Sequence, residues 1–242
     1  GVYKALEQTL GVPLFERLPR GLALTDEGLA LLPVLTDAFR RMSATLSQFE
    51  DGNFQEILTI GVVASFATGW LLRRLHRFKA QNPFVDLRIK TNNNTADMLL
   101  DGLDWFIRFG DGAWHGTDAA RLMDAPLSPV CAPSLRPRLR SPADLANEQL
   151  LRSYRVDEWG LWFRAAGIEP PKLRGWMFDS SLTLVEAAAQ GVGVALVPVA
   201  MFALEIEAGR IVQPFDVTAS MGSYWLTRLH SRAENVRVVR LR

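Results

Sequence analysis

The chain has 242 residues, and its 27 lysines and arginines against 26 aspartates and glutamates give a formal net charge of +1, too small to indicate a partner. Hydrophobic residues make up 48% and charged residues 22%, without low-complexity tracts or repeats, which excludes a disordered chain and a solenoid. The single cysteine, Cys131, excludes an intramolecular disulfide and a Cys-rich metal site. Because the chain shows neither a secretion signal nor an apolar run that could cross a bilayer, we expect a cytoplasmic protein without a membrane partner.

Residues 1–24 combine the end of a helix with a short hairpin. Apolar residues four apart precede Gly11, which stands where helices commonly end. Apolar residues at 14–15 and 22–24 then flank a basic, turn-rich tip. Followed by a long helix, this order predicts the C-terminal part of a winged helix-turn-helix DNA-binding domain. We expect the front of that domain, with its base-reading helix, to be missing from this chain.

Arg17 and Arg20 are the basic residues of this hairpin. Arginines on a wing contact backbone phosphates, which position a protein on the duplex without reading its sequence. We therefore expect both arginines to contact the DNA backbone, although each taken singly also fits a solvated turn residue. Residues 1–50 carry no excess of basic over acidic side chains, so the DNA-binding prediction rests on the motif and not on charge.

Residues 25–55 are predicted to form a long linker helix. Thr25 is a good N-cap, and Asp26 and Glu27 suit the positive end of the helix dipole. Apolar residues then recur at spacings of three and four, the period of a coiled-coil seam, which predicts a dimerisation helix. An amphipathic helix packed on its own domain is the alternative. The seam consists of Leu32, Leu35, Phe39, Met42 and Leu46, continued by Phe49.

After residue 55, short apolar strands alternate with helical segments, which is typical of a parallel α/β sheet with helices on both faces. We expect a two-lobed sensor of the periplasmic-binding-protein type: lobe I from residues 56–126 and 216–242, and lobe II from residues 127–215. The two chain crossings would form a hinge. The expected strands are 58–63, 85–89, 103–109 and 222–229 in lobe I, and 127–132, 150–154, 176–180 and 192–198 in lobe II. The expected helices are 68–80, 97–100, 142–147 and 181–190.

Two serines stand where such a fold binds its ligand, beyond the carboxyl ends of strands and between the lobes. Ser65 follows the strand at 58–63 and precedes a helix, and Ser181 opens another helix. A hydroxyl and the free N–H groups of a helix N-terminus suit a carboxylate or a phosphate. The alternative is that each serine is only an N-cap. Together they predict a site for an anion or a peptide carboxylate.

The wing, the linker helix and the two-lobed sensor, in this order, resemble the LysR-type transcriptional regulators over essentially the whole chain. Within that family, five long and almost gap-free blocks resemble the branch that regulates inducible β-lactamase. The branch that regulates glycine cleavage is similar in outline but lacks two of these blocks, so a regulator of another small-molecule pathway stays the alternative. The blocks cover residues 102–119, 150–167, 177–188, 211–215 and 222–232.

The resemblance implies a regulator that binds promoter DNA as a homodimer or homotetramer and works with RNA polymerase. Its implied effector is a peptidoglycan fragment: an anhydro-muropeptide favours activation, and a UDP-linked muramyl peptide favours repression, of a β-lactamase or cell-wall-recycling gene. Carried over by position, the effector-binding residues are Ser65, Asp97, Ser181 and Tyr224. The branch has Gly-Thr where this chain has Ala64 and Ser65, so the hydroxyl is kept while Ala64 adds a methyl group at the edge of the site.

The side chains of this set suit a muropeptide, which presents carboxylates, amides and an amine. Asp97 accepts from an ammonium or amide N–H, and Tyr224 offers a ring with a hydroxyl. From the residues alone, Asp97 also fits a solvated position and Tyr224 a core strand. A group of five polar residues further along the chain fits either a cluster at the cleft or, as we prefer, a structural ion-pair network. It consists of Arg152, Tyr154, Arg155, Asp157 and Glu158.

The sequence does not favour an enzyme. His76, His115 and His230 lie far apart without the spacing of a zinc site, and neither a G-x-S-x-G elbow nor a P-loop is present, so we expect no catalytic residue, metal or cofactor. Cys131 lies in an apolar run and is expected to be a small buried hydrophobe. A transport solute-binding protein shares the two-lobed architecture, but it has no use for a wing and a dimerisation helix.

Overall fold

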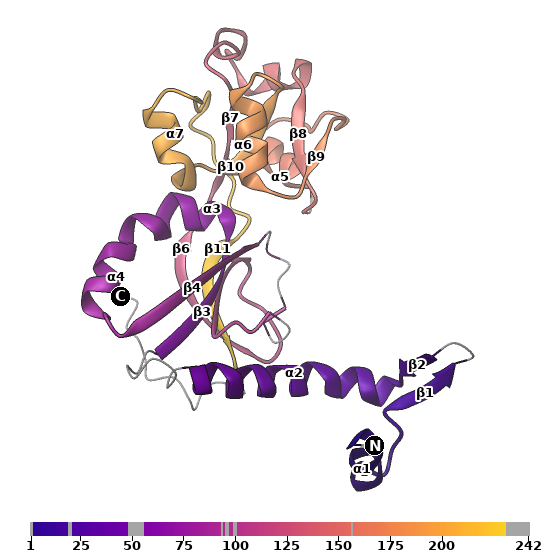
Figure 1. Cartoon of the computed structure of the whole chain (residues 1–242). Helices are drawn as coiled ribbons and strands as arrows, with labels where there is room; N and C mark the ends of the chain where they lie inside the picture. Colours follow the sequence, from indigo (N-terminus) through magenta and orange to yellow (C-terminus); the bar gives the residue numbers. More distant parts are fainter. Residues whose placement is uncertain are drawn as a thin grey trace.

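The computed structural model describes residues 2–18, 21–47, 56–92, 94, 97–98, 101–155 and 157–230. Figure 1 shows two stacked α/β lobes, a long helix beneath one of them, and a hairpin and a short helix at the far end of that helix. None of the helices within these residues is both long and apolar enough to span a bilayer.

The N-terminal piece is a helix attached to a two-stranded hairpin. The Glu7 carboxylate accepts hydrogen bonds from the backbone N–H groups of Leu14 and Phe15, at 2.8 and 3.1 Å, and so fixes the start of the hairpin on the helix. Arg17 is exposed and lies within the first strand, whereas Arg20 lies outside the described residues. The elements are α1 (Val2–Leu10), β1 (Phe15–Leu18) and β2 (Gly21–Leu24), and the strands pair antiparallel.

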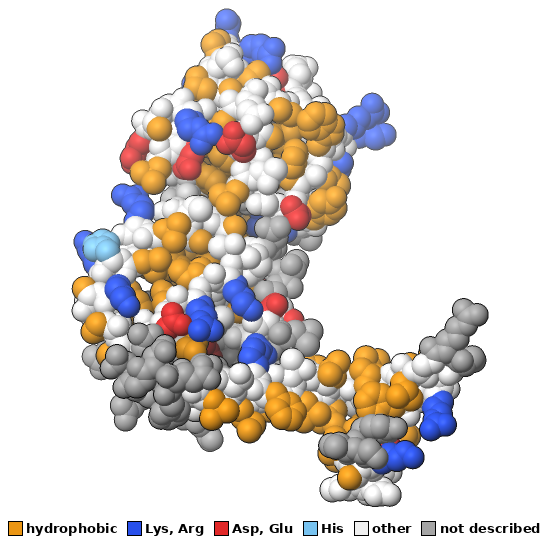
Figure 2. Space-filling model, in the orientation of Figure 1, with side chains coloured by type: hydrophobic (Ala, Val, Ile, Leu, Met, Phe, Trp, Pro, Cys, Tyr) orange, Lys and Arg blue, Asp and Glu red, His pale blue; other side chains and the backbone are white. Residues whose placement is uncertain are grey.

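Helix α2 (Asp26–Ser47) occupies most of the expected linker helix. It begins at the expected cap, because the Thr25 hydroxyl accepts a hydrogen bond from the N–H of Gly28 at 3.1 Å. Figure 2 shows hydrophobic side chains gathered along this helix. The side chains of the seam are largely exposed, and only Leu35 is half-buried among its described residues. The exposed fractions are 47% for Leu32, 66% for Phe39, 60% for Met42 and 65% for Leu46. Phe49 lies outside the described residues.

The other side of α2 contacts lobe I. Asp37 is buried and pairs with Arg40 at 3.0 Å between Oδ1 and Nη2. The Arg40 guanidinium lies directly over Gly102 of lobe I, where a Cβ atom would collide with it and where φ is +66°. Only glycine fits this backbone conformation and this close approach without strain. The linker helix and the sensor are therefore in direct contact.

Lobe I contains a five-stranded mixed sheet in the order β4-β3-β5-β11-β6. Strands β4 and β5 pair parallel to β3, whereas β11 pairs antiparallel to both β5 and β6. The strands are β3 (Glu56–Val63), β4 (Val85–Asn92), β5 (Trp105–Gly110), β6 (Thr117–Asp124) and β11 (Ser223–Leu229). The covering helical segment is α3 (Ala64–Phe66), a π-helical turn (Ala67–Leu71), a 3-10 turn (Leu72–Arg74) and α4 (Leu75–Gln81).

Lobe II contains a four-stranded sheet in the order β7-β10-β8-β9, in which only the β7–β10 pair is antiparallel. Its strands are β7 (Leu127–Val130), β8 (Leu150–Ser153), β9 (Met177–Phe178) and β10 (Val194–Pro198). Its α-helices are α5 (Glu158–Ala165), α6 (Ser181–Ala189) and α7 (Ala203–Glu207). Its 3-10 turns are Arg136–Arg138, Pro142–Asn147 and Val199–Phe202.

The expected two-lobed α/β fold is confirmed, with a difference in strand direction. Both sheets are mixed rather than wholly parallel, because β6, β7 and β11 run antiparallel to their neighbours. Of the helix expected at 97–100, residues 99 and 100 lie outside the described residues; the N–H of Asp101 donates to the carbonyl of Asp97 at 2.9 Å.

One apolar core joins the two lobes. Phe66 and Tyr224 of lobe I belong to the same buried cluster as Leu184 and Ala188 of α6 in lobe II. Contiguous burial of this kind is the main favourable term in holding two layers together. The N-terminal end of α6 is thereby held close to the end of β3, and this proximity creates the site described next.

Candidate functional site

A cavity of about 280 Å³ lies between the lobes, at the carboxyl end of β3 and the start of α6. This is the place where open α/β sheets bind ligands. Lobe I contributes Val63, Ala64, Ser65 and Asn94, and lobe II contributes Ser153, Tyr154, Arg155, Asp179, Ser180 and Ser181. Eight of these ten residues carry hydroxyl, amide or charged side chains, so the cavity can form hydrogen bonds and ion pairs with a polar ligand.

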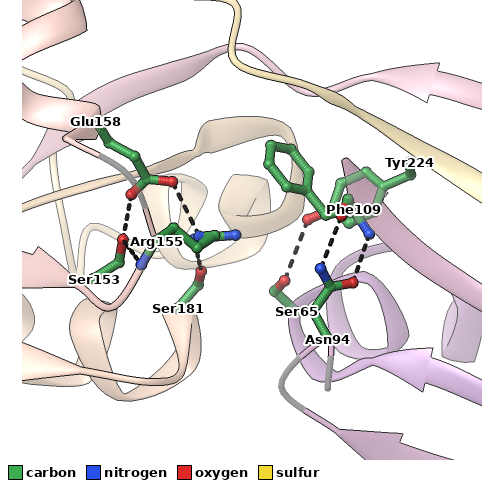
Figure 3. Close-up of polar contacts among 8 residues, drawn as sticks. All are labelled: Ser65, Asn94, Phe109, Ser153, Arg155, Glu158, Ser181 and Tyr224. Atoms are coloured by element: carbon green, nitrogen blue, oxygen red, sulfur yellow. Dashed lines mark hydrogen bonds and ion pairs between the residues drawn. The ribbon is translucent and has the colours of Figure 1, made fainter. Parts of the chain in front are cut away.

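On the lobe I side, the Ser65 Oγ lies 3.2 Å from the Tyr224 hydroxyl, in a hydrogen bond between two buried residues (Figure 3). The Tyr224 ring packs on Phe66 and Phe109, with centroids 4.8 and 5.6 Å apart. Burial raises the pKa of the Tyr224 phenol above its ordinary value, although the hydrogen bond with Ser65 and the charge of Arg155 oppose this shift. The phenol therefore stays protonated and supports the Ser65 hydroxyl from behind.

On the lobe II side, Arg155 is held by three different groups. Its Nε pairs with the buried carboxylate of Glu158 at 3.0 Å, and its Nη2 donates to the Ser181 Oγ at 3.3 Å. The guanidinium carbon also lies 5.1 Å from the Phe109 ring centroid, across the lobe boundary. Glu158 accepts a second hydrogen bond from the Ser153 hydroxyl at 2.6 Å, so its carboxylate is well satisfied. Arg155 is thus an oriented cation at the edge of the cavity.

Asn94 closes the lobe I end of the cavity in an unusual backbone conformation, with φ at +71°. Its side chain exchanges two hydrogen bonds with the backbone of Phe109: Nδ2 donates to the carbonyl at 2.8 Å, and Oδ1 accepts from the N–H at 2.9 Å. Asparagine tolerates the left-handed region better than other non-glycine residues, and such outliers often mark functional sites. Asn94 is therefore tied to β5.

The cavity offers complementary groups for a zwitterionic or peptide-like ligand. Arg155, the Ser181 hydroxyl and the first turn of α6 can receive an anion or a carbonyl oxygen. Asp179 supplies a carboxylate on the same wall, and Ser65 presents a hydroxyl that can donate or accept. Among the described residues no group of His, Cys, Asp and Glu side chains could hold a metal ion.

The structure brings most of the predicted site residues together. Ala64, Ser65 and Ser181 line the cavity, and Tyr224 lies directly behind Ser65 rather than on the wall. Asp97 is exposed and does not belong to the described residues that line this cavity. The N-cap interpretation of the two serines is wrong: Val63 and Ser180 are the capping positions of α3 and α6, and neither of these caps makes a side-chain hydrogen bond.

The polar cluster of residues 152–158 is both structural and part of the cavity. Both interpretations find support, because Arg155 pairs with Glu158, as the preferred ion-pair network requires, while Tyr154 and Arg155 also line the cavity. Sequence reasoning missed Asn94, Asp179 and Ser180. A signal was available for Asn94, because it follows β4 at its carboxyl end, the edge where β3 delivers Ser65.

The one cysteine confirms its expected role. Cys131 is fully buried, and burial raises the pKa of its thiol to about 11, so it remains an unreactive thiol in the core of lobe II.

A two-lobed sensor with a polar interlobe cavity, in contact with a long helix that carries a hairpin, is the architecture of a ligand-responsive transcription regulator. Residues 51–242 match the family model described as the LysR substrate binding domain. The chain belongs to the LysR-type transcriptional regulators, as the resemblance of its sequence implies.

Named relatives narrow the position within this family. The HTH-type transcriptional activator AmpR of Pseudomonas aeruginosa is 55% identical over 233 residues, which cover 96% of this chain and 79% of that protein. The carbapenem-hydrolyzing beta-lactamase transcriptional activator of Enterobacter cloacae is 45% identical, with coverage of 96% and 79%. A solved effector binding domain from Citrobacter freundii is 49% identical to this chain, with a TM-score of 0.73. The alignment covers 74% of this chain and 92% of that domain. In that domain a threonine, a serine and a tyrosine are replaced by valine, alanine and phenylalanine.

Proposed function

We propose that this chain is a transcriptional activator that controls a β-lactamase or cell-wall-recycling gene in response to muropeptides. The observation that carries the proposal is the interlobe cavity, in which Ser65 of lobe I faces Arg155 and Ser181 of lobe II. Relatives at 55% and 45% identity are transcriptional activators, and one of them is named for a β-lactamase. The same function implies action on promoter DNA in the cytoplasm, as an oligomer and together with RNA polymerase.

The side chains of the cavity match the groups of a peptide with free carboxylates. Arg155 and the start of α6 bind a carboxylate, Ser65 and Ser181 exchange hydrogen bonds with amide or carboxylate oxygens, and Asp179 accepts from an amine. The three substitutions in the Citrobacter freundii domain each remove a hydroxyl group. This supports the proposal, because the cavity wall of the present chain rests on the hydroxyls of Ser65, Ser181 and Tyr224.

Signal transfer to DNA uses the contact between the sensor and α2. Asn94 lines the cavity, and Gly102 lies a few residues further along the chain, beneath the Arg40 guanidinium. A ligand that prefers one arrangement of the lobes shifts the population of sensor states and, through this contact, the position of α2. Paired α2 helices then carry the change to the two DNA-binding hairpins.

Calorimetry on the whole chain tests the proposal. An anhydro-muropeptide and a UDP-linked muramyl peptide should bind, and glycine, the ligand class suggested by the glycine-cleavage alternative, should not. Ser65→Val should weaken muropeptide binding about tenfold or more, since it removes a hydroxyl and leaves the polar groups of the ligand unpaired. Ser134→Ala, which removes an exposed hydroxyl elsewhere in lobe II, is the matched control. Absence of muropeptide binding by the folded wild-type chain would contradict the proposed effector.

A further inference from the structure

A second cavity, of about 320 Å³, opens in lobe II next to the interlobe cavity. The two cavities share Ser153 and Arg155, so Arg155 stands between them. A ligand held against Arg155 in the first cavity can therefore extend into the second. The other residues of this wall are Arg152, Asp157, Glu158, Trp159, Leu173 and Met177.

Two opposite charges in this cavity are not paired with each other. Arg152 donates from Nε and Nη2 to the backbone carbonyl of Gly175, at 3.2 and 2.8 Å, which fixes the guanidinium in place. The Asp157 Oδ1 accepts from the N–H of Gly160 at 2.9 Å as the cap of α5. Among the described residues, neither Arg152 nor Asp157 takes part in a salt bridge, in contrast to Arg155 with Glu158. One cation and one carboxylate thus remain available on a single wall.

The rest of the wall is apolar. Trp159 is buried, and its indole N–H is already bound to the carbonyl of Leu151 at 2.8 Å, so its ring offers only apolar surface. Leu173 and Met177 complete this surface. An aliphatic stem gains favourable burial on such a wall, while a charged end reaches the polar groups.

We propose that this second cavity binds a zwitterionic amino-acid group, an ammonium and a carboxylate on one carbon, carried on an aliphatic side chain of the effector. Arg152 receives the carboxylate, Asp157 receives the ammonium, and Leu173 and Met177 pack on the stem. In a peptide, a diamino acid whose far end is a free amino-acid centre has this chemistry. The inference rests on the proposed function, since it names the part of the muropeptide that enters the second cavity.

Two muramyl tripeptides that differ by one carboxylate test the proposal. One carries diaminopimelate, with a free amino-acid end, and the other carries lysine, with the ammonium alone. Calorimetry on the whole chain should show at least about tenfold tighter binding of the diaminopimelate peptide, the range expected for one charge-assisted pair. Arg152→Met should abolish this preference and leave the affinity for the lysine peptide within about twofold, whereas Arg152→Lys should keep part of the preference.

Asp157→Asn should weaken both peptides equally, because both carry the ammonium. Asparagine caps a helix about as well as aspartate, so α5 is preserved in this variant. If wild type binds both peptides equally and Arg152→Met changes neither affinity, the second cavity is not the subsite, although the proposed function stands. If wild type binds neither peptide, the proposed function itself fails. If Arg152→Met lowers the thermal midpoint of the chain, Arg152→Lys takes its place in the comparison. Full loss of the diaminopimelate preference in Arg152→Lys, at unchanged stability, would also overturn the proposal.

Discussion

The guanidinium carbon of Arg155 lies 5.1 Å from the centroid of the Phe109 ring, so a cation of lobe II covers an aromatic ring of lobe I. Phe109 packs in turn on Tyr224, whose hydroxyl meets Ser65. The walls of the interlobe cavity therefore form one connected set of contacts across the lobe boundary. A ligand that competes for Arg155 acts on the junction of the lobes as well as on its own binding site.

Replacing Arg155 tests this junction. Arg155→Met should lower the free energy of unfolding by about 1–3 kcal/mol, because Glu158 is only 5% exposed and loses its cation. Denaturant unfolding measures the change. The Arg155→Met/Glu158→Gln double variant should recover part of the loss, since no buried charge is left without a partner. A double variant less stable than Arg155→Met alone would contradict this account.

The hydrogen bond between Ser65 and Tyr224 is suited to a double-mutant cycle. Ser65→Ala and Tyr224→Phe should each lower the free energy of unfolding by about 1 kcal/mol, because each leaves one buried hydroxyl without its partner. The double variant removes both hydroxyls and should cost clearly less than the sum of the two changes. Strict additivity would mean that the two hydroxyls do not interact in solution.

The Tyr224 phenol should resist ionisation in the native chain. Burial raises its pKa in the folded state above the value of about 10 in the unfolded chain. Above about pH 10 the folded chain therefore keeps a proton on Tyr224 that the unfolded chain loses. The contribution of Tyr224 to the free energy of unfolding is complete below about pH 10 and is lost as the pH rises further.

Absorbance titration of tyrosinate measures this effect, since the chain has only three tyrosines. One of them, Tyr224, should ionise at a higher pH in the folded chain than in the unfolded chain. Tyr224→Phe should remove that delayed step and leave the remaining titration unchanged, and Tyr154→Phe, at an exposed position, is the control. Retention of the delayed step in Tyr224→Phe would assign it to another tyrosine.

The sequence predicts those features that depend on local patterns. Alternation of apolar strands and helices indicates the two-lobed α/β fold, and Thr25 marks the start of α2 because capping is a local interaction. Strand direction is less visible in the sequence. Strand β11 lies antiparallel between β5 and β6, about a hundred residues away, and the apolar run of residues 222–229 carries no sign of its direction.

In the candidate site, too, the sequence predicts the residues that follow a local pattern and not those placed by long-range contacts. Ser65 and Ser181 could be found because each stands between a strand and a helix, a position with known chemistry. Asn94 follows β4 as Ser65 follows β3, but its two hydrogen bonds to Phe109 are long-range and are not visible in the sequence. The place of Asp179 on the cavity wall likewise depends on the tertiary structure. Arg155 belonged to a charged run, and only the tertiary structure distinguishes the arginine beside Glu158 from its neighbours.

The exposed seam of α2 leads to a prediction on assembly. Phe39, Met42 and Leu46 are 66%, 60% and 65% exposed on one face of the helix, which is costly unless a partner covers them. Phe39→Glu would place a charge in the middle of a paired seam and should convert an oligomer into monomers, as measured by sedimentation at matched concentration. Promoter binding should fall by about tenfold or more as the second hairpin is lost.

Arg41→Glu provides the matched control for this variant. Arg41 is exposed on the same helix but about half a turn from the seam, so a glutamate there changes the charge without entering the interface. The control chain should keep the mass of the wild type. If Arg41→Glu and Phe39→Glu dissociate the oligomer equally, charge on α2 and not the apolar seam governs assembly. If neither does so, α2 is not the dimer helix, and the amphipathic alternative, a helix packed only on its own chain, takes its place.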